Sequence, residues 1–329
     1  MTPMAQGKIT GTGSAVPEKV LTNHDLERMV DTTDEWITAR TGIRERHVAA
    51  DGEYTSTLAT RAASRALEMA RVEPRDLDLI IVATVTPDYP FPATACLVQN
   101  SLQALNAAAF DLSAACSGFI YGLSIVDKFI RCGAARSALV IGAEVLSRIV
   151  DWSDRNTCCL FGDGAGAVVI EASDSGRGIL STHLHSDGTY WELLHQPAVG
   201  NRNPAGESVL NERLHFLRMQ GNEVFRLAVR AMEDAAHEAL ATNGLTVADV
   251  DIFIPHQANR RIIDAIGKRL GLNAEKVYVN LERFGNTSAA SIPIALDEAN
   301  RTGAIGDGNI ALFNAFGGGL TWASALVRW

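Results

Sequence analysis

The sequence predicts a layered α/β fold built from two similar halves. Three observations predict it. The chain has 329 residues, of which 47% are apolar, enough for a large buried core. Short β-rich runs alternate with longer helical patterns. A segment of the first half also recurs in the second half.

The predicted elements follow one another along the chain. Runs such as LIIVATV (79–85) have the length and composition of buried strands. The helical pattern at 118–131 is apolar nearly all round, which predicts a central, buried helix. We expect strands at 78–85, 107–112, 137–143, 165–170, 250–255, 276–280 and 309–314. We expect helices at 57–71, 118–131, 222–242, 260–270 and 288–301.

The recurring segment defines the two halves. Residues 62–81 align with residues 235–254 without a gap, and seven of the twenty positions are identical. Both copies read as a helix, an acidic turn and a strand. The boundary falls near 171–176, which predicts an N-terminal half at 1–173 and a C-terminal half at 174–329. Since no low-complexity linker separates the halves, we expect them to share an extensive interface.

Composition limits the classes of partner. The net charge of −9 argues against nucleic acid. No apolar run approaches the roughly 18 residues that a membrane span needs. The five cysteines contain no CxxC pair, so neither a disulfide framework nor a zinc site is indicated. The start, MTPMAQGKIT, has no apolar signal core. We therefore expect a cytoplasmic protein without metal, nucleic acid or membrane as a partner.

One cysteine has an unusual setting. The segment DLSAACSGFIYGL (111–123) places Cys116 among small residues at the start of the buried helix. The positive end of a helix dipole favours thiolate, and small neighbours leave room for a substrate. The alternative is a structural role, because cysteine is often a small buried hydrophobe. The remaining cysteines are interpreted as packing residues: Cys96, Cys132, Cys158 and Cys159.

Two polar residues follow strands in the second half. His256, in IPHQAN, follows strand 250–255, and Asn286, in FGNTSAASIP, precedes a helix of small residues. Ligand sites of α/β proteins gather at the carboxyl ends of strands. The structural alternatives are a capping or space-filling histidine and an asparagine N-cap. If the halves pack about a pseudo-twofold axis, the turns of Cys116 and Asn286 face each other with His256 nearby. Together the three indicate nucleophilic thiol chemistry.

These motifs and the terminal NAFGGGLTW resemble the β-ketoacyl-acyl-carrier-protein synthase III family of the thiolase superfamily. The segments DTTDEWITARTGIRERH (31–47) and FGDGAGAVV (161–169) match it as well, and the motifs occur in family order over nearly the whole chain. The resemblance implies a thiolase-like five-layer αβαβα fold of two pseudo-symmetric halves. It also implies a homodimeric acyltransferase with no permanently bound cofactor.

By this resemblance, the reaction is a decarboxylating Claisen condensation that initiates fatty acid biosynthesis. An acyl-CoA primer, acetyl or another short or branched acyl group, acylates Cys116. Malonyl-acyl-carrier protein then loses CO₂ and attacks the thioester, which gives a 3-oxoacyl-acyl-carrier protein. The backbone N–H groups of Cys116 and Gly318 would form the oxyanion hole. His256 and Asn286 would bind the malonyl thioester carbonyl as it becomes an enolate.

The resemblance also implies residues for each substrate. Contacts to CoA are expected from Trp36, Arg40, Arg155, Asn222 and Asn259. The acyl pocket is expected from Phe161, Leu194, Leu217 and Phe316, and from Phe91, which would reach across the dimer into the partner's pocket. A basic patch on an acidic protein suits an acidic carrier protein. We expect that patch at Gln257, Ala258, Asn259, Arg260, Arg261, Arg226, Lys268 and Arg269.

Other functions remain open at this stage. One alternative is an initiating ketosynthase of polyketide or quinolone assembly, and another is an acyltransferase without condensation. Thiolases and chain-elongating synthases are less compatible, since their motifs carry a second histidine or cysteine at the position of Asn286. A non-catalytic partner subunit is disfavoured by the intact set of Cys116, His256 and Asn286. The sequence does not identify the primer.

Overall fold

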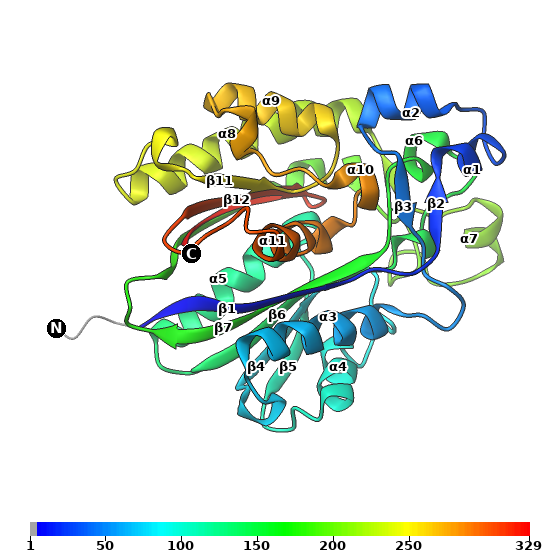
Figure 1. Cartoon of the computed structure of the whole chain (residues 1–329). Helices are drawn as coiled ribbons and strands as arrows, with labels where there is room; N and C mark the ends of the chain where they lie inside the picture. Colours follow the sequence, from blue (N-terminus) through cyan, green and yellow to red (C-terminus); the bar gives the residue numbers. More distant parts are fainter. Residues whose placement is uncertain (1–4) are drawn as a thin grey trace.

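The computed structural model describes residues 5–329, and its helices and sheets stack in five layers (Figure 1). The first four residues of the N-terminal segment analysed above lie outside the described range. The fold is the predicted αβαβα arrangement: two sheets, one helical layer between them and one on each outer face. Each sheet therefore has both faces covered, as the apolar strand sequences require.

The first sheet and its outer helices come from the N-terminal half. The strand order is β1-β7-β6-β4-β5, with β4 parallel to β5 and β6, and β7 antiparallel to β1 and β6. The strands are β1 (Gln6–Ala15), β4 (Leu79–Ala83), β5 (Ala108–Leu112), β6 (Ser137–Glu144) and β7 (Gly164–Ser173). The covering helices, at the bottom of Figure 1, are α3 (Thr55–Ala70) and α4 (Thr94–Leu102).

The second sheet repeats this design. Its order is β11-β12-β13-β8, with only β11 and β12 parallel. The strands are β8 (Gly178–Ser186), β11 (Ile252–Pro255), β12 (Ile310–Gly317) and β13 (Thr321–Arg328). The outer helices at the top of Figure 1 are α8 (Gly221–Thr242) and α9 (Arg260–Leu270). The helices between the sheets are α5 (Gly118–Arg131) and α11 (Ser291–Arg301).

Shorter elements gather at the right of Figure 1, beside the ends of the sheets. They include β2 (Val20–Thr22), α1 (Asn23–Glu27), α2 (Asp34–Thr41), β3 (Glu45–His47), α6 (Arg155–Cys158), α7 (Glu207–Asn211) and α10 (Leu281–Phe284). Strands β9 (Leu194–His195) and β10 (Arg218–Met219) pair with each other. Single 3₁₀ turns are η1 (Pro74–Asp76), η2 (Ala115–Ser117), η3 (Leu146–Arg148), η5 (Val247–Asp249), η6 (Ala274–Lys276) and η7 (Ser288–Ala290), and η4 (Gly188–Leu193) is longer.

The internal repeat corresponds to α3-η1-β4 in one half and α8-η5-β11 in the other. The aspartates that precede the strand in the two copies make equivalent hydrogen bonds. Asp78, just before β4, accepts the backbone N–H of Ser137 at the start of β6 at 3.1 Å. Asp251, just before β11, accepts the N–H of Ile310 at the start of β12 at 2.8 Å. Each carboxylate fixes the start of the neighbouring parallel strand, which explains why the acidic turn recurs.

All five predicted helices are present, and so are six of the seven predicted strands, with bounds shifted by a few residues. The predicted strand at 276–280 is wrong. The segment forms a single isolated bridge to Phe253, and the side chain of Gln257 then replaces a neighbouring strand. Its Nε2 donates to the Tyr278 carbonyl at 3.2 Å, and its Oε1 accepts the Asn280 N–H at 3.1 Å.

The turns before the two central helices lie against each other, as expected for a pseudo-twofold axis. Each contains a non-glycine residue in the left-handed region, Ala115 with φ 46° and Ser288 with φ 49°. By this match the counterpart of Cys116 is Ala289. Asn286 lies in the expected turn, three residues before this counterpart of Cys116. The end of β6 packs on the second turn so closely that a Cβ on Gly142 would lie 2.1 Å from the Ala289 carbonyl oxygen.

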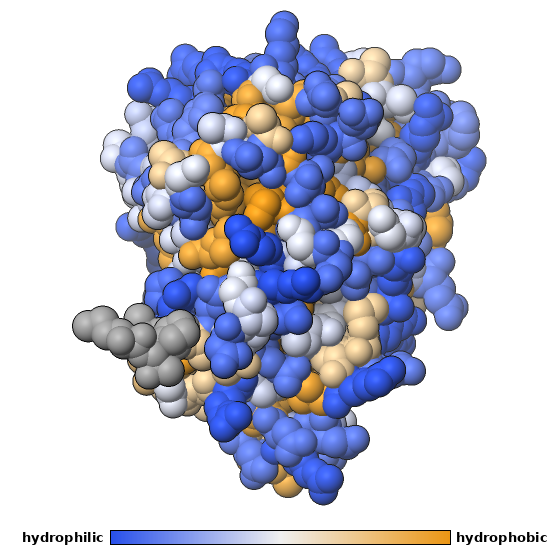
Figure 2. Space-filling view, turned by 60° about the vertical axis from the view of Figure 1, so that its left-hand side comes forward, coloured by the Kyte–Doolittle hydropathy of each residue, from blue (hydrophilic) through white to orange (hydrophobic). Residues whose placement is uncertain are grey.

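The surface is mainly hydrophilic on the face shown in Figure 2, apart from a region in its upper half where hydrophobic side chains gather. None of the helices described is long and apolar enough to cross a membrane. Among residues 5–329, no three His, Cys, Asp or Glu side chains come together in a group that could hold a metal ion.

Candidate active site

Two cavities meet at Cys116. The larger, of about 410 Å³, runs to the surface between α2, α6, α8 and α9 and is lined by His256 and Asn286 as well. The smaller, of about 110 Å³, is also lined by Cys116. Phe161 and Leu194 line both cavities together with Cys116. The structure thus brings together the three residues that the sequence predicted to be catalytic, and it places the thiol at the junction.

The backbone around Cys116 is held by the start of β13. Thr321 Oγ1 donates to the Ala114 carbonyl at 2.9 Å, and Ser117 Oγ donates to the Thr321 carbonyl at 3.1 Å. A Cβ on Gly317 would lie 2.6 Å from the Cys116 nitrogen, so only glycine allows β12 to end here. Gly318, the predicted second oxyanion donor, lines the smaller cavity beside Cys116.

Burial sets the protonation state of Cys116. Its residue is 7% exposed. Burial raises the pKa of the thiol to about 12, and the negative charge of Glu144 raises it further, whereas a hydrogen bond with Ser288 lowers it. The expectation that the helix start favours a thiolate is therefore not met at this buried residue. Cys116 therefore rests as a thiol, and a nucleophilic role would require another group to accept its proton.

His256 follows β11 and is buried. Burial lowers the pKa of its imidazole to about 3, so the ring is neutral. Its Nδ1 lies 2.7 Å from Ser291 Oγ at the start of α11. Because Nδ1 is occupied by Ser291, Nε2 is the ring nitrogen that is available to a ligand in the cavity. This arrangement suits a hydrogen-bond partner for a carbonyl oxygen better than a charged acid.

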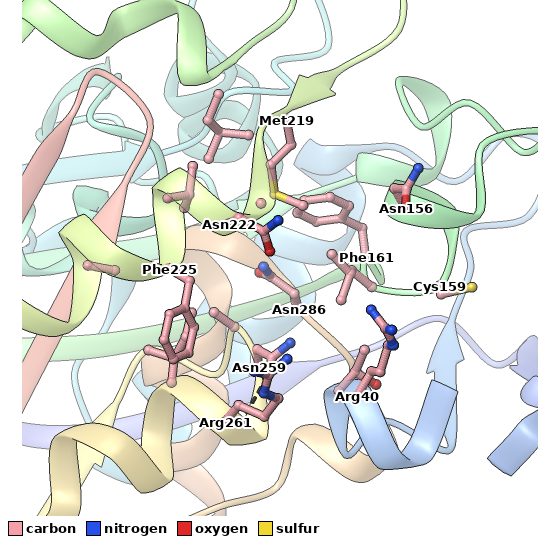
Figure 3. A pocket seen from close by; sticks show the side chains of 18 of the residues that line it. Arg40, Asn156, Cys159, Phe161, Met219, Asn222, Phe225, Asn259, Arg261 and Asn286 are labelled. Carbon is pink, nitrogen blue, oxygen red and sulfur yellow. Dashed lines mark hydrogen bonds between the residues drawn. The ribbon is translucent and has the colours of Figure 1, made fainter. Parts of the chain in front are cut away.

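Asn286 combines both roles that the sequence allowed. Its Oδ1 accepts the backbone N–H of Ser288 at 2.9 Å, as a cap of the η7 turn. The Nδ2 amide is left as a donor, and in Figure 3 the side chain lies at the centre of the larger cavity close to Asn222. The capping bond thus orients the amide that the sequence predicted to be a donor.

The larger cavity is lined by all five residues predicted to contact CoA. Trp36 carries two guanidinium groups on its ring: the Cζ atoms of Arg40 and Arg155 lie 4.9 and 5.0 Å from the ring centroid. Since Arg155 covers the indole, an adenine ring stacked between them requires Arg155 to swing away. Asn259 caps α9 through the Arg261 N–H, at 2.8 Å, which leaves its amide nitrogen for a ligand.

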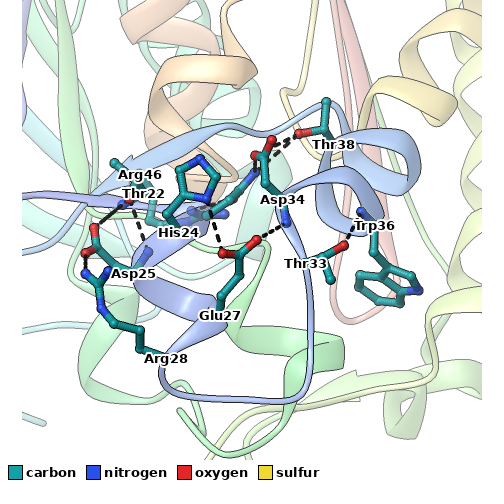
Figure 4. Close-up of polar contacts among 11 residues, drawn as sticks. Thr22, His24, Asp25, Glu27, Arg28, Thr33, Asp34, Trp36, Thr38 and Arg46 are labelled. Carbon is teal, nitrogen blue, oxygen red and sulfur yellow. Dashed lines mark hydrogen bonds and ion pairs between the residues drawn. The ribbon is translucent and has the colours of Figure 1, made fainter.

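The position of Trp36 is fixed by a polar network around α1 and α2 (Figure 4). Thr33 caps α2 by accepting the Trp36 N–H at 3.1 Å. Buried Asn23 donates to Asp34 Oδ1 at 2.8 Å and accepts from Arg46 Nη1 at 2.9 Å. Burial lowers the pKa of Arg46 to about 10, which is still far above neutrality. The guanidinium therefore remains charged and ties α2 to the core.

The predicted acyl-pocket residues divide into two sets. Phe161, Leu194 and Leu217 line the smaller cavity, whose other apolar walls come from Val85, Leu146 and Ile149. Phe316 lines the larger cavity instead. Phe91 is 85% exposed and touches neither cavity of its own chain. A role for Phe91 in a partner's pocket stays a prediction.

The predicted carrier-protein patch lies on α8, on α9 and on the turn before α9. Arg261 lies over Phe225, with its Cζ 5.5 Å from the ring centroid, and both residues line the mouth of the larger cavity. Arg269 pairs with Glu233 and Arg260 with Asp264. Within residues 5–329, Arg226 and Lys268 form no ion pair, so their charges face solvent without compensation. Ala258 lines the cavity mouth.

Gln257 is the exception, and its prediction as a carrier contact is wrong. Its residue is 1% exposed, and its amide is occupied by Pro255, Tyr278 and Asn280. Because the Gln257 side chain is buried and bonded to the segment after η6, it cannot contact a docked protein.

Sequence reasoning missed three residues around the predicted catalytic set: Ser288 and Ser291, which bond Asn286 and His256, and Glu144, whose charge acts on Cys116. The two serines occur in the quoted motif FGNTSAASIP, so their signal was their proximity to Asn286. Glu144 directly follows a long apolar strand sequence. An acidic residue at such a place is unusual, and this could have singled it out.

Two family models match the chain. The model for 3-oxoacyl-[acyl-carrier-protein] synthase III matches residues 110–188, and the model for its C-terminal part matches residues 240–329. A β-ketoacyl-[acyl-carrier-protein] synthase III of Caldanaerobacter subterraneus subsp. tengcongensis is 59% identical over 98% of this chain and 97% of its own length.

Solved structures agree with these matches. A 3-oxoacyl-[acyl-carrier-protein] synthase III from Aquifex aeolicus superimposes with a TM-score of 0.91 at 51% identity, covering 98% of this chain and all of its own. A priming β-ketosynthase from the R1128 polyketide pathway has a TM-score of 0.92 at 38% identity, over 100% and 97% of the two chains. The identities of 59% and 51% to these two synthase III proteins exceed the 38% identity to the polyketide ketosynthase. This chain is a member of the β-ketoacyl-acyl-carrier-protein synthase III family.

Proposed function

We propose that this condensing enzyme carries its acyl primer on Cys116 and uses His256 and Asn286 to stabilise the enolate of malonyl-acyl-carrier protein. The reaction is the initiating condensation of fatty acid synthesis, which gives a 3-oxoacyl-acyl-carrier protein and CO₂. The observation that supports these roles best is that Cys116 lines two cavities, a larger one that also holds His256 and Asn286 and a smaller one with mostly apolar walls.

In the first half-reaction, the pantetheine arm of acyl-CoA enters the larger cavity past Asn222 and Asn259. The acyl group passes the sulfur into the smaller cavity, whose 110 Å³ suit a short chain. Cys116 attacks the thioester carbon, and the backbone N–H groups of Cys116 and Gly318 stabilise the oxyanion. CoA then leaves through the larger cavity.

In the second half-reaction, the malonyl thioester takes the place of CoA. Its carbonyl oxygen receives hydrogen bonds from His256 Nε2 and Asn286 Nδ2, which stabilise the negative charge that appears as CO₂ departs. Because His256 is neutral and Asn286 does not titrate, both donors operate over a wide pH range. The carbanion attacks the acyl group on Cys116 and releases the thiol.

We further propose a homodimer with acyl-carrier protein and acyl-CoA as its partners. Strand β5 is an unpaired edge of the first sheet, and partly exposed apolar side chains on it, Phe110 and Leu112, support pairing with a second copy. The exposed Phe91 lies on the loop between β4 and α4. The basic side chains of Arg226, Arg261 and Lys268 beside the cavity mouth support docking of an acidic carrier.

The proposal includes the division into halves 1–173 and 174–329 and a cytoplasmic location. The first sheet ends with Ser173 and the second begins with Gly178, which supports the division. All five thiols are free in the described part of the chain, as is common in a reducing compartment.

Mass spectrometry of the intact protein after incubation with a panel of acyl-CoAs tests the proposal. We expect one acyl group per chain, on the peptide that contains Cys116, and none in the Cys116→Ala variant. Cys159→Ala is the matched control, because Cys159 lines the same cavity, and it should still be acylated. Acylation that persists without Cys116, or a wild-type protein that no acyl-CoA modifies, would contradict the proposal.

A further inference from the structure

Glu144, the last residue of β6, is a fully buried carboxyl group that the roles described above do not use. Three donors from the end of β4 converge on its Oε2. Thr86 Oγ1 donates at 2.6 Å, the Val85 N–H at 3.1 Å and Thr84 Oγ1 at 3.2 Å. Its Oε1 receives a longer contact from the Val85 N–H, at 3.3 Å.

The direction of these bonds is fixed by their other ends. Thr86 Oγ1 accepts the N–H of Val145 at 2.9 Å, and Thr84 Oγ1 accepts the N–H of Thr86 at 3.0 Å. Since a hydroxyl has a single proton, both hydroxyls point theirs at Glu144. Oε2 is thus an acceptor in every state, and a proton gained by the carboxylate belongs on Oε1.

Ser288 connects this carboxyl group to the nucleophile. The η7 turn, which begins at Ser288, lies between the end of β6 and the η2 turn of Cys116 and contacts both. Ser288 and Cys116 line the smaller cavity together. A hydrogen bond with the Ser288 side chain lowers the pKa of the Cys116 thiol and also that of the Glu144 carboxyl. The Ser288 side chain is therefore placed next to both the thiol and the buried acid.

We propose that Glu144 accepts the proton of the Cys116 thiol through the hydroxyl of Ser288 when the thiol attacks acyl-CoA. This inference rests on the proposed role of Cys116 as the acyl carrier. Glu144 acts through Ser288 and touches no substrate itself.

The step balances over the two half-reactions. During acylation the thiol proton passes to Ser288 Oγ while the Ser288 proton passes to Oε1 of Glu144. The sulfur bonds to the acyl carbon, the bond from that carbon to the CoA sulfur breaks, and the CoA thiolate takes a proton from water in the open cavity. During condensation the carbanion displaces the Cys116 thiolate, which takes its proton back from Glu144 by the same route.

The pKa values of the three titratable groups agree with Glu144 as the proton acceptor, Cys116 as the proton donor and His256 as a neutral hydrogen-bond donor. Burial raises the pKa of Glu144 to about 7, while that of Cys116 is about 12 and that of His256 is about 3. An acceptor is most effective when its pKa lies near the working pH. The groups that face Glu144 are the uncharged Thr84 and Thr86 from the segment after β4, Ser288 from η7 and Cys116 from η2.

The test is the rate at which iodoacetamide alkylates Cys116 as a function of pH, read by mass spectrometry, together with the rate of acylation by acetyl-CoA. Glu144→Gln keeps an oxygen that accepts from Thr84, Thr86 and Val85 but removes the proton acceptor. We expect both rates to fall about a hundredfold at pH 7.5, in line with the usual contribution of a proton acceptor, and the wild-type pH dependence near 7 to disappear.

A purely electrostatic role gives the opposite sign. If Glu144 were only a nearby negative charge, its removal would ease the ionisation of Cys116, and alkylation would become faster. Unchanged or faster alkylation in folded Glu144→Gln would therefore overturn the relay.

Ser288→Ala tests the relay independently if Glu144→Gln does not fold. It should slow both reactions to a similar degree, and the double variant should be no slower than either single variant. Ser124→Ala is the matched control, because Ser124 is also a buried serine but bonds Thr182 on β8. Additive losses would overturn the relay. A wild-type protein without alkylation or acylation at Cys116 would instead contradict the proposed function.

Discussion

The hydroxyl of Ser291 lies 2.7 Å from Nδ1 of His256, and its oxygen also accepts the backbone N–H of Gln257 at 3.2 Å. Since a hydroxyl that accepts one hydrogen bond still has its own proton, Ser291 can donate to Nδ1. The imidazole, neutral because burial lowers its pKa, then carries its own proton on Nε2. Ser291 thus selects the tautomer that donates into the cavity.

Ser291→Ala should slow decarboxylation while sparing acylation. Without the hydroxyl, the ring loses one hydrogen bond, worth about 1 kcal/mol, and both tautomers become accessible. We expect release of ¹⁴CO₂ from labelled malonyl-acyl-carrier protein to fall roughly five- to tenfold. Acylation at the wild-type rate serves as the internal control, and an equal loss in both steps would show that Ser291 serves the fold.

Asn286→Asp should separate the two functions of Asn286. The aspartate retains an oxygen that accepts the Ser288 N–H but lacks the amide donor. Loss of such a donor typically costs about 3–4 kcal/mol, a hundred- to a thousandfold in rate. We expect CO₂ release to fall by that factor while acyl-Cys116 still forms. Asn286→Ala, which also removes the cap, should add a loss of thermal stability. CO₂ release at the wild-type rate in either variant would contradict the assignment.

Trp36→Ala should raise the KM for acyl-CoA and leave kcat nearly unchanged. Stacking of a base on an aromatic ring contributes about 1–3 kcal/mol, so the increase is expected to be roughly five- to a hundredfold. Trp191→Ala is the control, since Trp191 also lies beneath an arginine, Arg202, but outside the larger cavity. A drop in kcat without a change in KM would place Trp36 outside the CoA site.

Acidification should destabilise the protein partly through His256. Its pKa is lowered from 6.5 to about 3, so below pH 6.5 the unfolded chain binds a proton that the folded chain does not. Stability contributed by the neutral form is therefore complete above pH 6.5 and declines between pH 6.5 and 3. Between pH 7 and 5, this group accounts for about 2 kcal/mol.

Urea unfolding at several pH values measures this effect. His256→Gln should lose about 2 kcal/mol less than the wild type over that interval. His237→Gln, at an exposed position of α8, is the control and should follow the wild type. Parallel pH profiles for His256→Gln and the wild type would show that the imidazole is not held neutral.

Charge reversal at Arg261 should weaken use of the carrier protein. Arg261→Glu places a negative charge at the cavity mouth, and we expect the KM for malonyl-acyl-carrier protein to rise about tenfold, most strongly at low salt. Acylation by acyl-CoA should change much less. Arg177→Glu, on the loop before β8, is the control for net charge. Equal effects of the two variants would locate the docking surface elsewhere.

Much of the fold could be predicted from the spacing of apolar residues and from the internal repeat. The central helix of Cys116 and the amphipathic helix 260–270 occur at the predicted residues, because each carries a continuous apolar pattern. The strand at 276–280 failed for a reason that the local sequence does not contain. The bonding partner of its backbone is the side chain of Gln257, twenty residues earlier.

The candidate site was predictable at positions where the residue type and its motif indicate a chemical role. Cys116, His256 and Asn286 were found, whereas Glu144 and Ser291 were not, because their roles depend on which groups face them across the two halves. The same reason explains the failure at Gln257, which looks like a surface residue in the sequence and is buried by its neighbours. The charge state of Cys116 also follows from burial, a tertiary property, and not from its place before a helix.

The contact between the two left-handed turns has a consequence for how the enzyme fails. The thiol comes from one half and its amide and imidazole partners from the other, and β6 touches the second turn with no spare room at Gly142. A slippage of a few tenths of an ångström between the halves would disrupt the chemistry while both sheets stay intact. Catalysis should thus be lost at lower denaturant concentrations than helical circular dichroism, which makes activity the more sensitive gauge of how tightly the halves are joined.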